Sequence, residues 1–550
     1  MAEQEENFDF VIVGSGAGSV PAALVLHERG QRALIIEKQA VIGGSTAFSG
    51  GVIWIPNNDH LNADGGNDSP MRARTYLDGL VGDAGAASSV ERRDAFIRYG
   101  TEMVRFLERH GMKFLHAHWP DYYDNRPGGS PEGRSLCAPL FNVKELGEWA
   151  TKLGHFPLTS SMPITSRDVV VIFTAKRTWR GKWMVAKLAL RMLEKKLTGK
   201  EIRGAGNALQ GRLLQIALGK GIPIWTETKV KDFLVQKGEV VGVVAERDGA
   251  TINVKSRLGV LINAGGFSRN LAMRETYQPK PTSVNWTVAN PGDTGEMIRA
   301  AEAFGAKLEL MNEAVWLASS YMPDGTFSAF HSPNDIGKPY CIVVDSKGRR
   351  FANESCSYME FGQRMYAAGA VPAWAILDSR HRSYYPWGML LPGVTPAAMI
   401  ECGYIKKSNN LPELALACGI DPSGLARTVA RFNDFARAGN DKDFGRGQSA
   451  YNHYYGDPTV RPNPNLGAIE RAPFYAIALW PGDVGTCGGI LTDEYARVLR
   501  SDRSVIRGLY ATGNSTASVM GRCYPGAGAT IGPSMTFGYI AASHASAESA

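Results

Sequence analysis

Three glycines and one acid near the N-terminus have the spacing of a dinucleotide-binding site. Gly14, Gly16 and Gly18 lie in one short turn, and Glu37 follows about twenty residues later. Glycines let main-chain amides approach a pyrophosphate, and the N-terminus of the next helix adds partial positive charge. Ser19 replaces the third glycine of G-x-G-x-x-G and is small enough to keep helix and strand close. These residues predict a dinucleotide site in which Glu37 accepts hydrogen bonds from ribose hydroxyls.

A second glycine-rich loop, residues 42–51, follows at once and favours a flavin over a nicotinamide. A flavin dinucleotide runs along the main chain over a longer path, so a second loop with little side-chain bulk suits it. The run E-K-x-x-x-x-G-G-S-T from Glu37 to Thr46 resembles the FAD flavoproteins of the fumarate reductase/succinate dehydrogenase group. Members with covalently bound flavin carry a histidine in this loop, whereas none lies between His27 and His60. We therefore expect non-covalent FAD.

The residues expected to bind this cofactor come from both glycine loops, a later strand that ends in A-G-G, and a C-terminal turn. They are Gly14, Gly16, Ala17, Gly18, Glu37, Lys38, Gly43, Gly44, Ser45, Thr46, Ser49, Gly50, Gly51, Ala264, Gly265, Gly266, Asn514, Gly528, Thr530 and Ile531. No metal site is expected, since the seven cysteines are scattered and lack C-x-x-C spacing.

Buried apolar runs predict the elements that position these loops. Strands are expected within residues 8–13, 33–36, 258–263 and 505–511, which are rich in Val, Ile and Leu. The alternation across residues 222–246 predicts a β-meander. We predict an α/β fold. Its Rossmann-like FAD-binding domain comprises residues 1–280 and 470–550, and an α+β substrate domain is inserted at 281–469.

Length and composition set the class of protein. At 550 residues the chain can bury two cores, in keeping with two domains. Seven scattered cysteines fit a reducing compartment better than a disulfide framework. The polar, acidic N-terminus predicts no secretory signal, and the sequence holds no apolar run of about twenty residues. The expectation is a cytoplasmic protein.

One segment is strongly basic. Residues 176–200 hold nine Lys/Arg and the single acid Glu194, interleaved with Trp179, Trp183 and several aliphatic residues. A basic amphipathic helix with tryptophans can lie on an anionic membrane surface. A solvated helix that covers the flavin domain is the alternative, so peripheral membrane contact stays open. Nucleic acid is not expected as a partner, because no known binding module accompanies the charge.

The C-terminal motif carries a more specific resemblance. Residues 513–538, which include Y-P-G-A-G-A-T-I-G, resemble the 3-ketosteroid dehydrogenases, FAD enzymes that desaturate ring A of a 3-oxosteroid. Residues 349–358, 120–129 and 472–489 also match motifs of this family. The resemblance covers nearly the whole chain. It implies a 3-oxosteroid substrate and an external electron acceptor that reoxidises the flavin.

The resemblance also implies catalytic roles. Tyr524 and the Gly528 N–H would polarise the C3 carbonyl, because donors that strengthen as enolate charge develops acidify the neighbouring hydrogen. Tyr358, assisted by Tyr122, would take the C2 proton, and flavin N5 would accept the C1 hydride. A tyrosine with an ordinary pKa of about 10 needs such help to act as a base. The adjacent Tyr123 competes with Tyr122, and the spacing to the P-G-G sequence favours Tyr122.

Three alternatives remain open from the sequence. A 3-keto-5α-steroid Δ4-dehydrogenase, or a desaturase of smaller cyclic ketones, would share the same carbonyl site. A fumarate-type reductase would instead need arginine and histidine side chains at the flavin face. A flavin-binding module without activity would tolerate replacement of Tyr358 and Tyr524 by phenylalanine.

Overall fold

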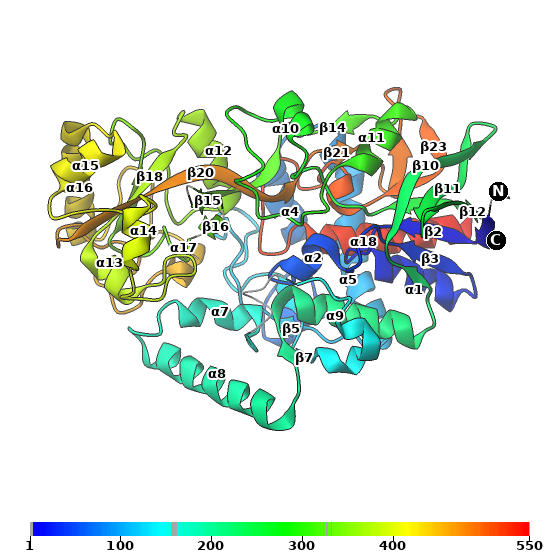
Figure 1. Cartoon of the computed structure of the whole chain (residues 1–550), viewed down its shortest axis with the longest axis horizontal. Coiled ribbons are helices and arrows are strands. Elements are labelled where there is room, and N and C mark those ends of the chain that lie inside the picture. The colour runs from blue at the N-terminus through cyan, green and yellow to red at the C-terminus, as the bar shows by residue number, and fades with distance from the viewer. Residues whose placement is uncertain (1–3, 156–161, 323, 326–327, 332, 549–550) are drawn as a thin grey trace.

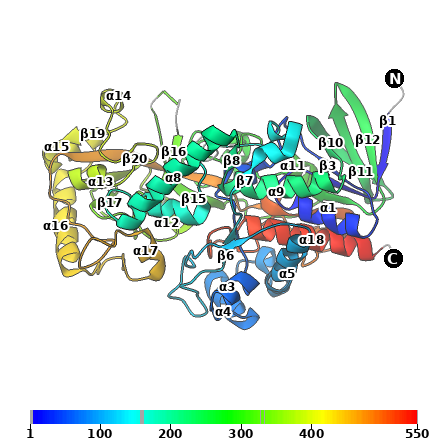
Figure 2. The ribbon, with the colours of Figure 1, turned by 90° about the horizontal axis from the view of Figure 1, so that it is seen from below.

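The computed structural model describes residues 4–155, 162–322, 324–325, 328–331 and 333–548. The molecule is elongated, with one sheet region toward each end and both termini at the same end (Figure 1). Figure 2 shows the same division from below. The architecture confirms the predicted α/β class with a second α+β region.

The sheet nearest the termini contains the predicted buried strands. Its order is β22-β23-β13-β2-β3-β9, and every pair except β22–β23 is parallel. Every residue of β2 (Phe10–Val13), β3 (Ala33–Ile36) and β13 (Val260–Ile262) is buried, which explains their uninterrupted apolar sequences. The other strands are β9 (Ile224–Trp225), β22 (Arg497–Leu499) and β23 (Val505–Ala511).

A four-stranded sheet of order β1-β12-β11-β10 lies beside it. The expected meander is confirmed as β10 (Thr228–Gln236), β11 (Glu239–Arg247) and β12 (Ala250–Ser256). The strand predicted within residues 8–13 is confirmed as β2, but it starts at Phe10, because the chain changes sheets at Asp9 and Phe8 belongs to a separate strand, β1 (Gln4–Phe8). The polar sequence of β1 gives no strand signal. Its main chain is satisfied by parallel pairing with β12.

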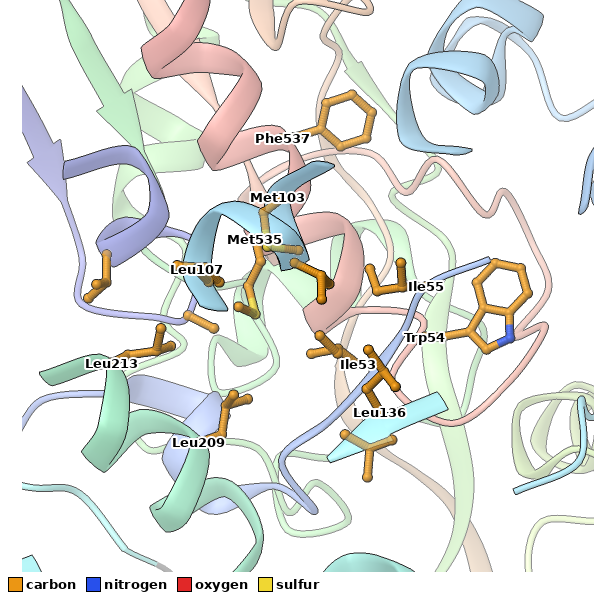
Figure 3. Close-up of a cluster of buried hydrophobic side chains, with 14 of the residues drawn as sticks. Ile53, Trp54, Ile55, Met103, Leu107, Leu136, Leu209, Leu213, Met535 and Phe537 are labelled. Carbon is orange, nitrogen blue, oxygen red and sulfur yellow. The ribbon is translucent and has the colours of Figure 1, made fainter. Parts of the chain in front are cut away.

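Helices cover the parallel sheet and enclose its core. The first is α1 (Ser19–Glu28), which packs on α18 (Ile531–Ala547), and α18 in turn packs on α5 (Val90–Arg109). Figure 3 shows Met535 of α18, Met103 and Leu107 of α5, and Leu209 and Leu213 of α9 (Ala205–Gly219) around β4 (Val52–Trp54). This core supports β4, which later forms one wall of the site.

The second large sheet is antiparallel and has the order β16-β15-β20-β18-β17. Its strands are β15 (Ala314–Tyr321), β16 (Ser328–His331), β17 (Cys341–Val344), β18 (Ala373–Leu377) and β20 (Phe474–Thr486), with β19 (Lys406–Ser408) pairing on β20. The domain limits stay a prediction. Strand β20 begins just after residue 470 and pairs with β15 and β18.

The remaining elements connect these layers or cover their outer faces. The helices are α2 (Gly44–Phe48), α3 (Asp59–Ala63), α4 (Pro70–Val81), α7 (Ser166–Ile172), α8 (Trp179–Thr198), α10 (Leu271–Tyr277), α11 (Glu296–Ala303), α12 (Tyr358–Ala367), α13 (Ser379–Tyr384), α14 (Ala397–Glu401), α15 (Leu411–Cys418), α16 (Pro422–Ala438) and α17 (Ala450–Tyr455). The short strands are β5 (Leu115–His116), β6 (Ser135–Cys137), β7 (Phe141–Asn142), β8 (Ile202–Arg203), β14 (Leu308–Glu309) and β21 (Gly489–Ile490). Among the described residues, no helix combines the length and apolarity needed to cross a bilayer.

Candidate active site

One cavity, of about 410 Å³, extends from the N-terminal glycine turn to a group of tyrosines. Its glycine end is lined by the ends of β2 and β3, by α2 and by the start of α18. Its tyrosine end receives residues from α12, from the loop after β5 and from the segment before α18. The cavity therefore joins the parallel sheet to the antiparallel one.

The glycine end is shaped by close main-chain packing. Gly14 has φ +100°, and a Cβ there would lie 2.2 Å from the Asn263 carbonyl oxygen. Glu37 is buried beside this turn, where its carboxylate accepts hydrogen bonds from Ser15 N at 3.1 Å and Gln39 N at 2.9 Å. Burial raises the pKa of Glu37, which these hydrogen bonds oppose. The turn and the acid thus have the placement that a dinucleotide requires.

The second glycine loop is folded around the short helix α2. Thr46 Oγ1 accepts a hydrogen bond from Ala17 N at 3.2 Å, which ties the two loops together. Gly51 has φ +61°, and a Cβ there would lie 2.4 Å from the main chain of Ala205. Glycine at position 51 therefore lets this loop pack closely against the start of α9.

Most of the predicted cofactor residues line the cavity, and four do not. Those four are Ala17, Gly18, Gly43 and Gly266. A Cβ at Gly18 would lie 2.4 Å from the Ser534 carbonyl oxygen, and one at Gly266 would lie 2.1 Å from Thr486 Oγ1. Gly43, with φ +103°, begins α2. Gly18 and Gly266 therefore allow close packing of the chain, and Gly43 allows it to turn.

An acidic pair at the start of α11, Asp293 and Glu296, also lines the glycine end. Asp293 accepts a hydrogen bond from Ser45 Oγ at 2.9 Å, and Glu296 forms an ion pair with Lys38 at 2.9 Å. Burial raises the pKa of Asp293 to about 6. The available signal was P-G-D-T-G at residues 291–295, a glycine-flanked acid before a helix.

Three tyrosines from distant parts of the sequence meet at the other end. The ring centroid of Tyr358 lies 5.2 Å from that of Tyr524 and 5.4 Å from that of Tyr122. The ring centroids of Tyr122 and Tyr524 are 5.6 Å apart. All three side chains line the cavity. Burial raises the pKa of each above the ordinary value for tyrosine, so each is a neutral phenol at neutral pH.

Tyr524 stands in a loop that is pressed against β4. Gly528 has φ +92°, and a Cβ there would lie 2.2 Å from the Val52 carbonyl oxygen. The Tyr524 hydroxyl lies 3.5 Å from Thr530 Oγ1. Contacts with Thr530 and with the Gly528 amide lower the pKa of Tyr524 and partly offset its burial. The phenol of Tyr524 and the amide of Gly528 therefore lie close together.

Tyr122 is held by its neighbours in the loop after β5. Its main-chain N–H donates to the Pro525 carbonyl oxygen at 2.9 Å, which joins this loop to the Tyr524 loop. Asp121 is fully buried, accepts a hydrogen bond from Trp54 Nε1 at 2.8 Å and pairs with Arg134. Tyr123, the competing candidate, is not among the residues that line the cavity.

Tyr358 is the first residue of α12, and a buried charge network fixes the preceding turn. Arg350 pairs with Glu354 at 2.7 Å and with Asp441 at 2.9 Å, and Arg446 pairs with Glu354 at 3.0 Å. These charges are buried together, which satisfies each of them away from the cavity. The network gives Glu354, four residues before Tyr358, a structural role.

Three further aromatic residues at this end escaped the sequence analysis. Trp119 and Tyr455 line the cavity, and the ring of Tyr451 lies 4.4 Å from that of Tyr122. The Tyr451 hydroxyl is buried without a hydrogen-bond partner among the described residues. The cluster Y-N-H-Y-Y at residues 451–455 was the available signal.

The charged residues that line the cavity argue against a fumarate-type reductase. Among the described residues that line it, none is arginine or histidine, and the basic ones are Lys38 and Lys229 at the glycine end. A fumarate-type reductase needs cationic side chains at the flavin face, so this lining disfavours it. Neutral phenols and a main-chain amide instead suit a ketone oxygen.

Three potential metal ligands lie elsewhere. Asp64, His116 and His118 bring their ligand atoms within 4.8 Å of one another, outside the cavity lining. His116 Nδ1 lies 2.8 Å from Asp64 Oδ2, and its Nε2 lies 3.0 Å from the Gly133 carbonyl oxygen. Both ring nitrogens therefore have partners within the protein. The absence of a metal stays a prediction.

Comparisons with known proteins agree with this arrangement. The FAD binding domain family matches residues 9–531. The chain is 42% identical to a 3-oxosteroid 1-dehydrogenase of Mycobacterium tuberculosis, over 98% of each chain. It is 34% identical to the 4-oxocyclohex-2-ene-1-carboxylate 5-dehydrogenase of Sinomonas cyclohexanicum, over 97% of this chain and 92% of that one.

A solved structure extends the comparison to three dimensions. The 3-ketosteroid delta1-dehydrogenase from Sterolibacterium denitrificans, in complex with 1,4-androstadiene-3,17-dione, is 36% identical and superposes with a TM-score of 0.93. The match covers 99% of this chain and 100% of that one. The expected FAD cofactor and the family resemblance are thereby confirmed. This chain belongs to the 3-oxosteroid 1-dehydrogenase family of FAD-binding flavoproteins.

Proposed function

We propose that this protein is an FAD-dependent dehydrogenase that introduces the 1,2 double bond into ring A of 3-oxosteroids. One observation carries the proposal: Tyr122, Tyr358 and Tyr524 come from three distant segments and line the same cavity as the glycine turn. The names of the relatives support the substrate class. Bound FAD would supply the hydride acceptor, with N5 receiving hydride from C1.

The carbonyl site consists of Tyr524 and Gly528. The C3 oxygen would accept hydrogen bonds from the Tyr524 hydroxyl and the Gly528 N–H, both of which strengthen as negative charge develops on that oxygen. Tyr524 suits a donor because burial keeps it protonated. The positive φ of Gly528 and its contact with β4 hold the amide in place before substrate arrives.

Tyr358 would remove the C2 proton. Its raised pKa means that the phenolate must be stabilised, and Tyr122 is the nearest hydroxyl-bearing ring besides Tyr524. We assign Tyr122 to stabilise that charge and pass the proton on. General base catalysis of this kind contributes about 10²–10⁴-fold to the rate.

The cofactor would be held without a covalent bond. The loop at residues 42–51 contains no histidine, and its cavity-lining members are small or hydroxyl-bearing apart from Phe48. Glu37 would bind the ribose, and the N-terminus of α18 at Thr530 and Ile531 would face the flavin ring. An external acceptor must then take two electrons for each turnover.

Anaerobic mixing with 4-androstene-3,17-dione tests the proposal. This substrate already has the 4,5 double bond, so loss of two hydrogens from ring A gives the 1,4-diene. We expect the visible flavin absorbance to bleach and a product two mass units lighter to form in equal amount. No bleaching with this substrate would refute the assigned reaction.

Two further substrates distinguish the proposed Δ1-dehydrogenase from a Δ4-dehydrogenase and from a desaturase of small cyclic ketones. With 5α-androstane-3,17-dione, a 1-ene product supports the proposal, whereas a 4-ene product indicates a Δ4-dehydrogenase. Turnover of 4-oxocyclohexanecarboxylate without turnover of any steroid would indicate a desaturase of small cyclic ketones, to which one relative belongs by name. NMR of the products distinguishes the double-bond positions.

A further inference from the structure

A buried arginine at the start of α5 has no acidic partner among the described residues. Arg92 is only 2% exposed, and it lies in the first turn of the helix, where a positive charge is unfavourable. Its guanidinium donates hydrogen bonds to the carbonyl oxygens of Ala87 and Ala517, and its Nε has no hydrogen-bond partner in the described structure. A buried charge in such surroundings costs folding free energy unless an opposite charge compensates it.

Other fully buried arginines do have an acidic partner. Arg134 and Arg446 each form an ion pair with a buried carboxylate, at 2.7 Å and 3.0 Å. Burial lowers the pKa of Arg92 to about 10, and acids such as Asp493 oppose this shift only in part. The guanidinium of Arg92 is therefore charged at neutral pH and lacks the compensation that the other buried arginines have.

A small cavity lies between Arg92 and residues of the cofactor site. It has a volume of about 30 Å³ and is lined by Arg92, by Pro533 and Phe537 of α18, and by Asn514 and Thr530. The Cζ of Arg92 lies 5.1 Å from the centroid of the Phe537 ring, which Figure 3 labels. Asn514 and Thr530 also line the large cavity, so they form a wall between the two. None of the described residues that line the small cavity is acidic.

The first turn of α18 adds positive potential at the same wall. The helix begins at Ile531 with Thr530 as its N-cap, and its first turn holds no acidic side chain. The unpaired N–H groups at a helix N-terminus carry partial positive charge. Arg92 and this helix end therefore both raise the electrostatic potential on one side of the cofactor site.

We infer that Arg92 stabilises the negative charge that the flavin acquires when it is reduced. Transfer of a hydride adds two electrons and one proton to the neutral flavin ring, which leaves one net negative charge. A fixed positive charge behind Asn514 and Thr530 favours the reduced form over the oxidised one, and burial away from water strengthens the attraction. The inference depends on FAD binding in the large cavity and not on which substrate supplies the hydride.

The midpoint potential of the bound flavin tests the inference, measured by stepwise chemical reduction against redox dyes with no steroid present. Arg92→Met removes the charge, so the ratio of reduced to oxidised flavin at a fixed potential should fall about tenfold, the order expected for two unit charges roughly 10 Å apart in a protein interior. For a two-electron couple, a tenfold change lowers the midpoint potential by about 30 mV. Arg92→Lys keeps a positive charge and should restore most of this loss at neutral pH.

Arg93→Met is the matched control. Arg93 is also buried, but it pairs with Asp78 at 3.0 Å and lines neither cavity. Its replacement should leave the midpoint potential unchanged. Arg92→Gln is a second neutral variant, which keeps an N–H donor for the two carbonyl oxygens and replaces Arg92→Met if that variant does not fold. Flavin content and melting temperature check the folding of each variant.

Three results would overturn the inference: neutral variants with the midpoint potential of the unmodified protein, an equal shift in Arg93→Met, or no recovery in Arg92→Lys. A purely structural role for Arg92 would lower the melting temperature of its variants and leave the potential unchanged. A protein that shows the expected shifts but does not oxidise steroids would refute the proposed function and support this inference.

Discussion

At the glycine end of the cavity the wall is mostly main chain, whereas at the other end it is three phenol rings on three separate segments. The glycine turn and its acid lie within residues 14–37, on adjacent strands of one sheet. The tyrosines are separated by more than 160 residues at each step along the chain. The turn and acid of the first end are close in sequence and are completed by distant segments, whereas the second end depends entirely on packing between distant segments.

This difference separates binding from turnover. Damage to the glycine end should remove the cofactor, because main-chain packing defines its shape. Damage to the tyrosine end should leave the flavin bound and stop its reduction, because single hydroxyls carry the proposed chemistry. Flavin content and reduction rate therefore report on the two ends independently.

The largest effect is expected for Gly14→Ala. A Cβ at this position would lie 2.2 Å from the Asn263 carbonyl oxygen, on a residue with φ +100°, so the turn must open. We expect purified protein with little or no flavin, measured by absorbance per mole of chain. Gly30→Ala is the control, since it also has positive φ but no atom within 4 Å, and it should keep its flavin.

Tyr358→Phe should retain flavin and lose about 10²–10⁴-fold in the anaerobic reduction rate. Because burial raises the pKa of Tyr358, the rate in the unmodified enzyme should also climb through the alkaline range without levelling near pH 10. Stopped-flow absorbance measures both. A variant that reduces flavin at the normal rate would remove Tyr358 from the mechanism.

Tyr524→Phe should cost about 10²–10³-fold in kcat through loss of one carbonyl donor. Tyr123→Phe is its control: this partly buried tyrosine follows Tyr122 but does not line the cavity, and its replacement should change kcat by less than about threefold. Equal losses in the two variants would show that general packing, and not the hydroxyl at the carbonyl site, limits turnover.

Asp293→Asn tests the acid at the glycine end by its effect on stability. The pKa of Asp293 is raised to about 6, so its contribution to stability is present at low pH and is lost as pH rises through about 6. The free energy of unfolding of the unmodified protein, relative to that of the Asn variant, should fall by up to about 3 kcal/mol between pH 4 and pH 7. Melting temperatures of both proteins across this range measure the effect, and parallel curves would contradict it.

The smallest effect is expected for Glu37→Gln. An amide keeps one acceptor and loses the charge, so FAD affinity should fall about tenfold, as for the loss of one hydrogen bond to a charged group. Titration of the apoprotein with FAD, followed by fluorescence, measures this affinity. The kcat at saturating FAD should be unchanged. A lowered kcat would mean that the two ends are coupled.

Much of the glycine end was predictable because its signals are local. Apolar runs, glycine spacing and one acid occur within short windows, and they correctly gave parallel strands, the first helix and the meander. Strand β1 was missed because its polar residues gain stability from pairing with β12, a partner nearly 250 residues away. Asp293 has a local signal, the glycine-flanked acid at residues 291–295, but its place at the cavity depends on contacts with Ser45, nearly 250 residues away.

By itself, the sequence indicated the fold class and the FAD-binding loops, since both depend on residue type and short-range spacing. The candidate tyrosines followed from the resemblance to the 3-ketosteroid dehydrogenases. Only the tertiary structure decided that Tyr122 rather than Tyr123 faces the cavity, that Tyr451 packs against Tyr122 while Tyr455 lines the cavity, and that four predicted cofactor residues do not line it. The reason is physical: which side of a loop faces a ligand depends on contacts between distant segments. No periodic pattern within one segment records those contacts.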